Sequence, residues 1–391
     1  MRALRTTIVV LVVSLGFLGG YFVGWYLHGD NVTTLSSGQR SSAKQAGALQ
    51  QRIIEELQRR YYKAVDVNTL SAAGVNGTLK SLNDPWTVYI DRTQLPAFEQ
   101  SLTGQFFGIG AYLHQTPKGL TISAVMPGAP AQKAGLKAGD TITGVDGKPI
   151  ASLATDVSVA LIKGKAGTQV TLDILPGGKP PQKQVVVTRQ RIEVPETKSR
   201  IIMDKGTKVG YVYLSQFGDY ATRDVTRDVQ SLTAKGAQWF ILDMRYNPGG
   251  LVTPALDVTN IFQQGVVTST KGLHSPLEVF QAKDPVVTSK PMVVLVNGDS
   301  ASASEIVTGA LKDHKRAEII GTRTFGKGLV QTIVNLGDGS ALKLTTAVYL
   351  TPNGTDINHK GIVPNIVVVN NPKTKKDEQL QAALDYIARS K

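Results

Sequence analysis

Three serines stand where a short apolar segment gives way to a helical pattern. Residues 291–296 are apolar and β-branched, which predicts a buried parallel strand, and the turn residues after them lead to Ser300, Ser302 and Ser304. Apolar residues at helical spacing continue from Ala303 and indicate a helix buried along one face. A serine at a helix start lies near free N–H groups and the positive end of the helix dipole, where an oxyanion would be stabilised. The three serines therefore suit either a nucleophile or simple capping of the helix.

A serine nucleophile needs a base, which is usually a histidine and alternatively a lysine kept neutral by desolvation. Lys327 stands between two glycines at the entrance of a strand pattern that covers residues 329–334. Because side chains alternate along a strand, Lys327 and Gln331 are predicted to point to the same side, where the amide could orient the amine. The alternative is a solvated lysine in a glycine turn. The five histidines are scattered, and none is an obvious partner for Ser302.

Residues 321–327 match the glycine and lysine spacing of a phosphate-binding loop. The next residue, Gly328, cannot supply the hydroxyl group that ligates magnesium in such a loop. The segment also leads into a strand pattern, whereas the loop motif requires a helix. Both features argue against nucleotide binding at this segment.

The composition excludes several other kinds of site. The 391 residues include no cysteine, which removes disulfides, cysteine-ligated zinc and a thiol nucleophile. The net charge is +13, but the lysines and arginines are scattered and form no basic stripe interleaved with aromatic residues. The sequence therefore predicts no nucleic-acid partner, and the charge leaves attraction to an anionic envelope as a secondary possibility.

The N-terminal residues 1–29 are predicted to be a membrane anchor or a signal segment. Arg2 and Arg5 precede an uncharged run over residues 8–27, which is long enough to cross a bilayer as a helix. No small-residue cleavage site follows Gly20, which favours an uncleaved single-pass anchor over a cleaved signal peptide. The rest of the chain would then lie on the extracytoplasmic side of the cell membrane.

The remainder of the chain changes texture several times and predicts a multidomain protein with α/β and β-rich parts. The predicted parts are a polar, serine-rich linker at 30–48, a helical segment at 49–103, a small β module of short strands at 104–191, an α/β core at 192–370 and a C-terminal helix within 371–391. Strand and helix patterns alternate through the core, which indicates parallel strands joined by crossover helices.

Several motifs together resemble the carboxyl-terminal processing peptidases, also called tail-specific proteases. The matching motifs are Ser300–Ile306, Thr324-Phe-Gly-Lys-Gly328 with Gln331, Asp243–Gly250, Phe107–Gly110 and Ser123–Asp140. They occur in the order that this family has, over roughly residues 49–370. The resemblance implies a PDZ domain and an α/β, crotonase-like serine protease core.

The resemblance also implies which residues act in catalysis. The family's nucleophile falls on Ser302, its general-base lysine on Lys327 and the glutamine that orients the lysine on Gln331. The oxyanion donors would be the backbone N–H groups of Ala303 and Gly250. Backbone donors at a helix start agree with what the chemistry needs.

In the PDZ module, the resemblance implies that Phe107, Gly108, Ile109 and Gly110 capture the C-terminal carboxylate of a substrate, while the following strand pairs with its tail. Lys163 stands where family members often carry an arginine that is thought to link tail binding to activation. Lysine keeps the charge but loses the bidentate geometry of arginine.

These observations and the resemblance predict a membrane-anchored serine endopeptidase with a Ser/Lys dyad, and they imply no metal and no organic cofactor. Its partners would be envelope proteins with apolar C-terminal tails, which it would cleave or degrade, and the membrane through its N-terminal helix. Helical arms at both ends, together with the resemblance, favour a homo-oligomer, and an activating partner is left open. The alternative is an inactive PDZ scaffold that only binds tails, which the presence of Ser302, Lys327 and Gln331 argues against.

Overall fold

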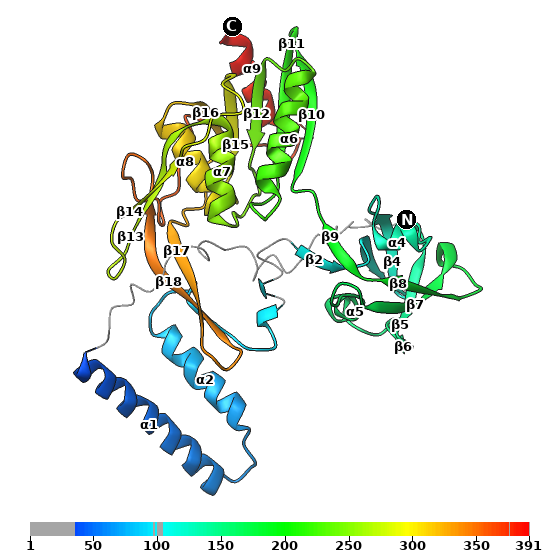
Figure 1. Cartoon of the computed structure of the whole chain (residues 1–391), viewed down its shortest axis with the longest axis vertical. Helices are drawn as coiled ribbons and strands as arrows, with labels where there is room; N and C mark the ends of the chain where they lie inside the picture. The colour runs from blue at the N-terminus through cyan, green and yellow to red at the C-terminus, as the bar shows by residue number, and fades with distance from the viewer. Residues whose placement is uncertain (1–35, 97, 100–104, 375, 391) are drawn as a thin grey trace. The chain divides into compact units, whose positions relative to one another are not determined.

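The computed structural model describes residues 36–390 apart from residues 97, 100–104 and 375. The predicted membrane helix at 8–27 lies outside these residues. Within the described part of the chain, no helix combines the length and the apolar character that crossing a bilayer requires. The chain divides into two compact units, one formed by the segment between residues 103 and 195 and the other by the parts that flank it (Figure 1).

The smaller unit is an antiparallel sheet with two helices and the strand order β3-β4-β5-β7-β8, to which β6 adds at β5. Its elements are β2 (Gln105–Gly108), β3 (Ala111–Thr116), β4 (Gly119–Val125), α4 (Pro130–Lys133), β5 (Thr141–Val145), β6 (Lys148–Pro149), α5 (Thr155–Ile162), β7 (Gln169–Leu175), the 3₁₀ turn η1 (Pro176–Gly178), β8 (Lys183–Thr188) and β9 (Gln190–Glu193). Val170, Leu172 and Ile174 alternate along β7 and are fully buried, as period-2 patterning requires. Strands β2 and β9 pair with each other as a separate ribbon.

The main sheet of the larger unit has the order β10-β11-β12-β15-β16-β19. Its strands are β10 (Thr197–Asp204), β11 (Thr207–Leu214), β12 (Trp239–Asp243), β15 (Met292–Val296), β16 (Ala317–Gly321) and β19 (Ile366–Val367). All neighbours are parallel except β10, which forms an antiparallel hairpin with β11. The alternation of strand and helix patterns thus predicted the parallel arrangement correctly.

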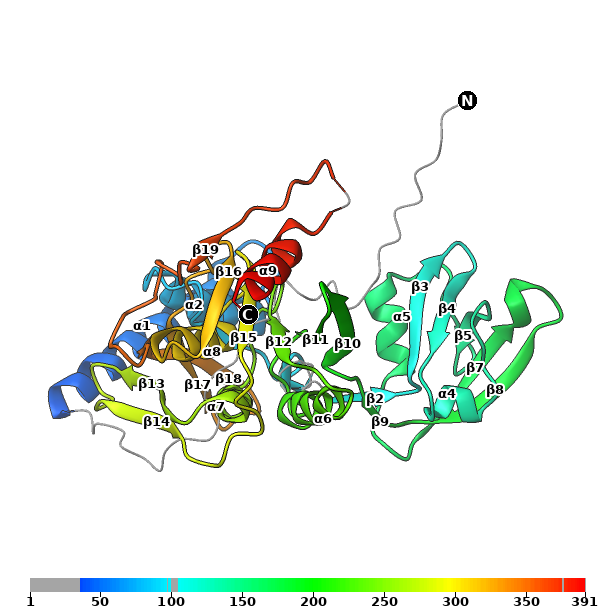
Figure 2. The ribbon, with the colours of Figure 1, turned by 90° about the horizontal axis from the view of Figure 1, so that it is seen from above.

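Helices cover both faces of the main sheet. They are α6 (Ala221–Ala234), α7 (Val252–Phe262), α8 (Ala303–Asp313) and α9 (Glu378–Arg389). The first three pack on one face, where Val294 and Val296 join their core, whereas α9 packs on the other face against Val293 and Leu295 (Figure 2). Every residue of β15 is buried, because alternate side chains enter the two cores.

A second, antiparallel sheet lies beside this layer and is centred on β18, which pairs with β1, β13 and β17. Its strands are β1 (Val88–Ile90), β13 (Gly265–Lys271), β14 (Glu278–Ala282), β17 (Leu329–Asn335) and β18 (Ala341–Leu350). The hairpin predicted at residues 337–339 joins β17 to β18, and Gly337 and Gly339 both have positive φ there. The pairing of β1 with β18 attaches the N-terminal segment to the core.

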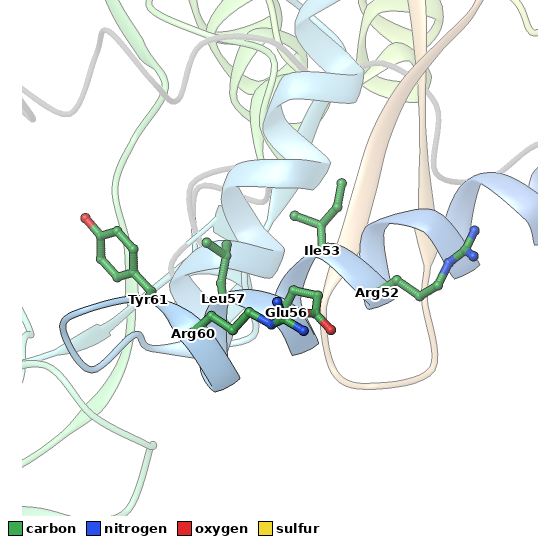
Figure 3. Close-up of a pocket in the computed structure, with 6 residues that line it drawn as sticks. All are labelled: Arg52, Ile53, Glu56, Leu57, Arg60 and Tyr61. Carbon is green, nitrogen blue, oxygen red and sulfur yellow. Dashed lines mark ion pairs between the residues drawn. The ribbon is translucent and has the colours of Figure 1, made fainter.

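The N-terminal helices are α1 (Ser37–Arg60) and α2 (Val67–Lys80). Helix α1 begins inside the segment that its composition indicated as a linker, because Ser36 and Gln39 form a reciprocal capping box. None of its residues is buried. A shallow pocket along α1 is lined by Arg52, Ile53, Glu56, Leu57, Arg60 and Tyr61 (Figure 3).

Candidate active site

Ser302 lies at the sharp turn between β15 and α8, where the sequence placed it. Its backbone has φ 54° and ψ −114°, a conformation that is strained for any residue other than glycine. The side chain is 1% exposed, and its Oγ has no hydrogen-bond partner among the described residues. The N–H of Glu305 donates to the carbonyl of Ser302 and leaves the hydroxyl unused. A buried hydroxyl on a strained turn is typical of a functional position and atypical of a plain helix cap.

The loop after β12 packs directly against this turn. The carbonyl of Asn247 accepts hydrogen bonds from Ala301 N at 3.1 Å and from Ser304 Oγ at 2.9 Å. A Cβ atom on Gly249, which has φ 103°, would lie 2.8 Å from the Cβ of Ser302. Only glycine therefore allows the loop to approach Ser302 so closely.

Two backbone N–H groups, one at the turn and one on the loop after β12, have no acceptor among the described residues. The N–H of Gly249 donates to Asn247 Oδ1 at 2.9 Å within its own loop. Neither Ala303 nor Gly250 donates its N–H to another residue in the part of the chain that the structure describes. These are the two groups that the sequence proposed as oxyanion donors, and Ala303 is the first residue of α8, where the helix dipole adds positive potential.

Glu305 joins the serine turn to the lysine segment. Its buried carboxylate accepts hydrogen bonds at Oε2 from Ser302 N at 2.9 Å and from Lys327 N at 2.8 Å. Its Oε1 accepts from Thr324 Oγ1 at 2.6 Å and from Gly326 N at 2.7 Å. Burial raises the pKa of this carboxyl group, and the four hydrogen bonds act in the opposite direction. The sequence analysis missed this role, although the Ser-x-x-Glu spacing of a capping box was a signal for it.

The amine of Lys327 is buried rather than solvated, so the alternative of an exposed lysine in a glycine turn is wrong. The residue is 2% exposed, and burial is the main cause that lowers its pKa to about 6. The charge of Lys343 lowers the pKa further, while Asp84 and Glu305 raise it. An amine with this pKa is largely neutral at pH 7 and can accept a proton.

Gln331 is also buried, at 1% exposure, on β17. Its Nε2 donates to Thr345 Oγ1 on the neighbouring strand at 3.0 Å, which fixes the direction of the amide. Its Oε1 has no hydrogen-bond partner among the described residues. The amide therefore keeps an acceptor available, as an orienting residue for an amine would need. Thr345 was not identified from the sequence.

The residues proposed to bind the substrate carboxylate lie at the start of the smaller unit. Phe107 and Gly108 end strand β2, and Ile109 is buried at 3% exposure. Gly110 has φ 72°, and a Cβ atom on it would lie 2.4 Å from the Cβ of Ala129. This close approach requires glycine and turns the chain into β3.

Strand β3 is an edge strand of its sheet, so one side of its backbone can pair with an added strand. Helix α5 is linked to it by a hydrogen bond from Thr155 Oγ1 to Gln115 Oε1 at 3.2 Å. Lys163 is the C-terminal capping residue of α5, and burial lowers its pKa. Arg189, which the sequence analysis did not identify, donates from Nε to the carbonyl of Ile162 at the same helix end.

Comparisons with known proteins agree with this architecture. The model of peptidase family S41 matches residues 208–368, and the PDZ domain model matches residues 97–175. A carboxy-terminal-processing protease of Bartonella bacilliformis is 40% identical over 323 residues, which are 81% of this chain and 73% of the relative. A probable CtpA-like serine protease of Staphylococcus aureus is 39% identical over 319 residues, and this chain spans only 62% of its length.

Among solved structures, the photosystem II D1 C-terminal processing protease is similar, with a TM-score of 0.52 and 29% identity. The match covers 86% of this chain and 96% of that protein. Fold and site together define a serine-type peptidase that carries a PDZ domain. The chain belongs to peptidase family S41 and, within it, to the carboxy-terminal-processing proteases. The predicted family, PDZ module and enzyme class are therefore confirmed.

Proposed function

We propose that this chain is a serine endopeptidase in which Ser302 is the nucleophile and Lys327 the general base. The observation that carries the proposal is the Glu305 carboxylate, which accepts hydrogen bonds from the backbone N–H groups of both residues. An unpaired hydroxyl on a strained turn and a desolvated amine are the two groups that a Ser/Lys mechanism needs.

The reaction proceeds in two halves. The neutral amine of Lys327 takes the proton of Ser302 Oγ as this oxygen attacks the scissile carbonyl carbon, and the N–H groups of Ala303 and Gly250 bind the resulting oxyanion. The ammonium of Lys327 then returns the proton to the leaving amine as the C–N bond breaks. Water hydrolyses the acyl-enzyme with the same lysine as base. The unpaired Oε1 of Gln331 is the acceptor available to orient the amine during these proton transfers.

Substrates are recognised by their apolar C-terminal tails. Residues 107–110 bind the tail carboxylate, and the open edge of β3 pairs with the tail backbone, which is the geometry of strand addition. Lys163 lies at the end of α5 and binds the tail through its positive charge. It lacks the two parallel hydrogen bonds that an arginine would form with a carboxylate.

The membrane attachment and the homo-oligomer rest on the sequence and on α1. Residues 8–27 anchor the chain, with the peptidase on the extracytoplasmic side. Protection of the chain from added protease in cells with an intact outer surface would contradict this orientation.

Leu49 and Ile53 are each 53% exposed on α1, which supports burial of this helix against a second copy. A monomer in sedimentation experiments would contradict the oligomer. An activating partner would bind the same exposed apolar residues of α1.

The lowered pKa of Lys327 predicts how cleavage depends on pH. Below a pH of about 6 the amine is protonated and cannot act as a base, so kcat/KM should rise with pH through about 6 and level off above about 8. The measurement is cleavage of a soluble peptide reporter at a series of pH values, with the melting temperature recorded at each. A flat profile in an enzyme that stays folded would contradict the role of Lys327.

The proposed function is tested with an unfolded reporter protein that ends in an apolar tail. The full chain should degrade this reporter at least about tenfold faster than the same reporter with a carboxamide terminus, because hydrogen bonds to a carboxylate contribute about 1.5–3 kcal/mol. Ser302→Ala is the control, which should bind the tail and not cut it. Tail binding by the wild type without cleavage would favour the inactive scaffold.

A further inference from the structure

The turn between α2 and β1, residues 84–87, packs against the lysine end of the candidate active site. The ring centroid of Trp86 lies 4.1 Å from Lys327 Nζ, although the two residues are 241 positions apart in the sequence. Strand β1 pairs with β18 immediately after this turn, in a register that places Val88 opposite Lys343. An aromatic face at this distance stabilises the ammonium form of an amine.

The same turn is connected to Gln331 by hydrogen bonds. Asp84 Oδ2 accepts from Thr87 Oγ1 at 2.6 Å, and Thr87 Oγ1 accepts from Thr345 N at 3.1 Å. Thr345 Oγ1 in turn accepts from Gln331 Nε2 at 3.0 Å. The direction of the Gln331 amide therefore depends on a residue that is itself held by the N-terminal segment.

Lys343 is a second buried lysine, and the proposed mechanism does not use it. It lies two residues before Thr345 on β18, so both side chains point to the same face of the strand. It is 6% exposed and forms no ion pair with a described residue within 4.0 Å. Burial lowers its pKa to about 8, and the charge of Asp84 opposes this change.

Three charged groups act on the Lys327 amine from three different elements. Asp84 from the turn and Glu305 from α8 favour its ammonium form, and Lys343 from β18 disfavours it. Glu305 is already fixed by its four backbone and hydroxyl donors. Asp84 and Lys343 therefore act on the protonation of the Lys327 amine in opposite directions, and neither residue belongs to the Ser302 turn.

We propose that Asp84, Trp86 and Lys343 are positioning residues of the peptidase, which set the charge around the Lys327 amine. Asp84 also holds the Gln331 amide in place through Thr87 and Thr345. This inference rests on the proposed function, since it assigns the residues to the same reaction. It makes the N-terminal helical segment a part of the catalytic site. A general base is most effective when its pKa lies near the working pH, and opposed charges are a means of placing it there.

The test compares the pH profiles of kcat/KM for the full-length wild type, Asp84→Asn and Lys343→Met. Asp84→Asn removes a charge that favours the ammonium and should move the rising limb to lower pH. Lys343→Met removes a charge that disfavours it and should move the limb to higher pH. Each shift should be at least about 0.5 pH unit, a threefold change in the protonation ratio. The matched controls Asp385→Asn and Lys205→Met change the same charges in an exposed ion pair and should leave the limb in place.

A substitution series at Trp86 separates the aromatic face from simple burial. Trp86→Phe keeps an aromatic ring and should retain the wild-type limb, whereas Trp86→Leu keeps apolar cover without a ring and should move the limb to lower pH. An equal effect of both substitutions would overturn the contribution of the ring.

A second readout covers variants that cleave too slowly to give a profile. In a Ser302→Ala background, the rate at which acetic anhydride acetylates Lys327 is followed against pH by peptide mass spectrometry, and its midpoint should shift in the same two opposite directions. Superimposed curves, or shifts of the same sign, overturn the inference. Failure of the proposed function looks different, because the wild type would then not cleave, or Lys327→Ala would still cleave, whatever the acetylation midpoints are.

Discussion

Ser302→Ala and Lys327→Ala are each expected to lower kcat/KM by at least about 10³-fold, because removal of a nucleophile or its base leaves only the binding and oxyanion contributions to catalysis. The two losses should not add in the double variant, since the residues act as one unit. The measurement is degradation of the tailed reporter by each purified variant, with tail affinity determined separately. Substantial cleavage by Lys327→Ala would show that another group is the base.

Lys327→Arg and Lys327→Met serve as controls for this prediction. Arginine keeps the positive charge but cannot lose a proton near neutral pH, so the arginine variant should be as inactive as the alanine variant. Methionine fills the same space without an amine.

The buried amine of Lys327 also lowers the stability of the folded protein at neutral pH. Its pKa is about 6 in the folded protein and 10.5 without burial, so at a pH between these two values the amine must lose a proton when the chain folds. Lys327→Met should therefore be inactive and should unfold at a higher temperature than the wild type at pH 7.

Local patterns in the sequence predicted the elements that position the nucleophile. The apolar run of β15, the small residues after it and the helical spacing of α8 all act within one strand–turn–helix unit, so their effects are visible in a short window. The hairpin at residues 337–339 and the C-terminal helix were predicted correctly for the same reason. The resemblance to a family placed Lys327 and Gln331 in the same site, which the spacing alone left undecided.

The contacts that complete the site could not be predicted in this way. Trp86 reaches Lys327 only because β1 pairs with β18, and this register is set by packing between segments far apart in the sequence. Lys343 looks like an exposed lysine on an alternating strand, but it is buried between two neighbouring strands, opposite Val88 of β1 and Ile333 of β17. The positive φ of Ser302 is likewise imposed by the surrounding loop, since no local propensity favours it in a serine.

Glu305→Gln is expected to lower kcat by at least about 10²-fold while the affinity for the tail stays unchanged, because a displacement of about 1 Å in a catalytic group can cost this much. An amide presents one acceptor oxygen in place of two. Either the N–H groups of Ser302 and Lys327 or the donors of Thr324 and Gly326 would then face an NH₂ group.

The same substitution should lower the free energy of unfolding by about 2–6 kcal/mol, since two buried donors lose their acceptor at about 1–3 kcal/mol each. Glu318→Gln on β16 is the matched control and should change neither quantity, because Glu318 makes no side-chain hydrogen bond or ion pair with a described residue. Activity is measured well below the melting temperature, where both variants are folded. If Glu305→Gln unfolds earlier but keeps the wild-type kcat, the carboxylate only stabilises the fold. If kcat falls while the protein is folded, the carboxylate aligns the nucleophile with its base, because no other described side chain binds the backbone of both residues.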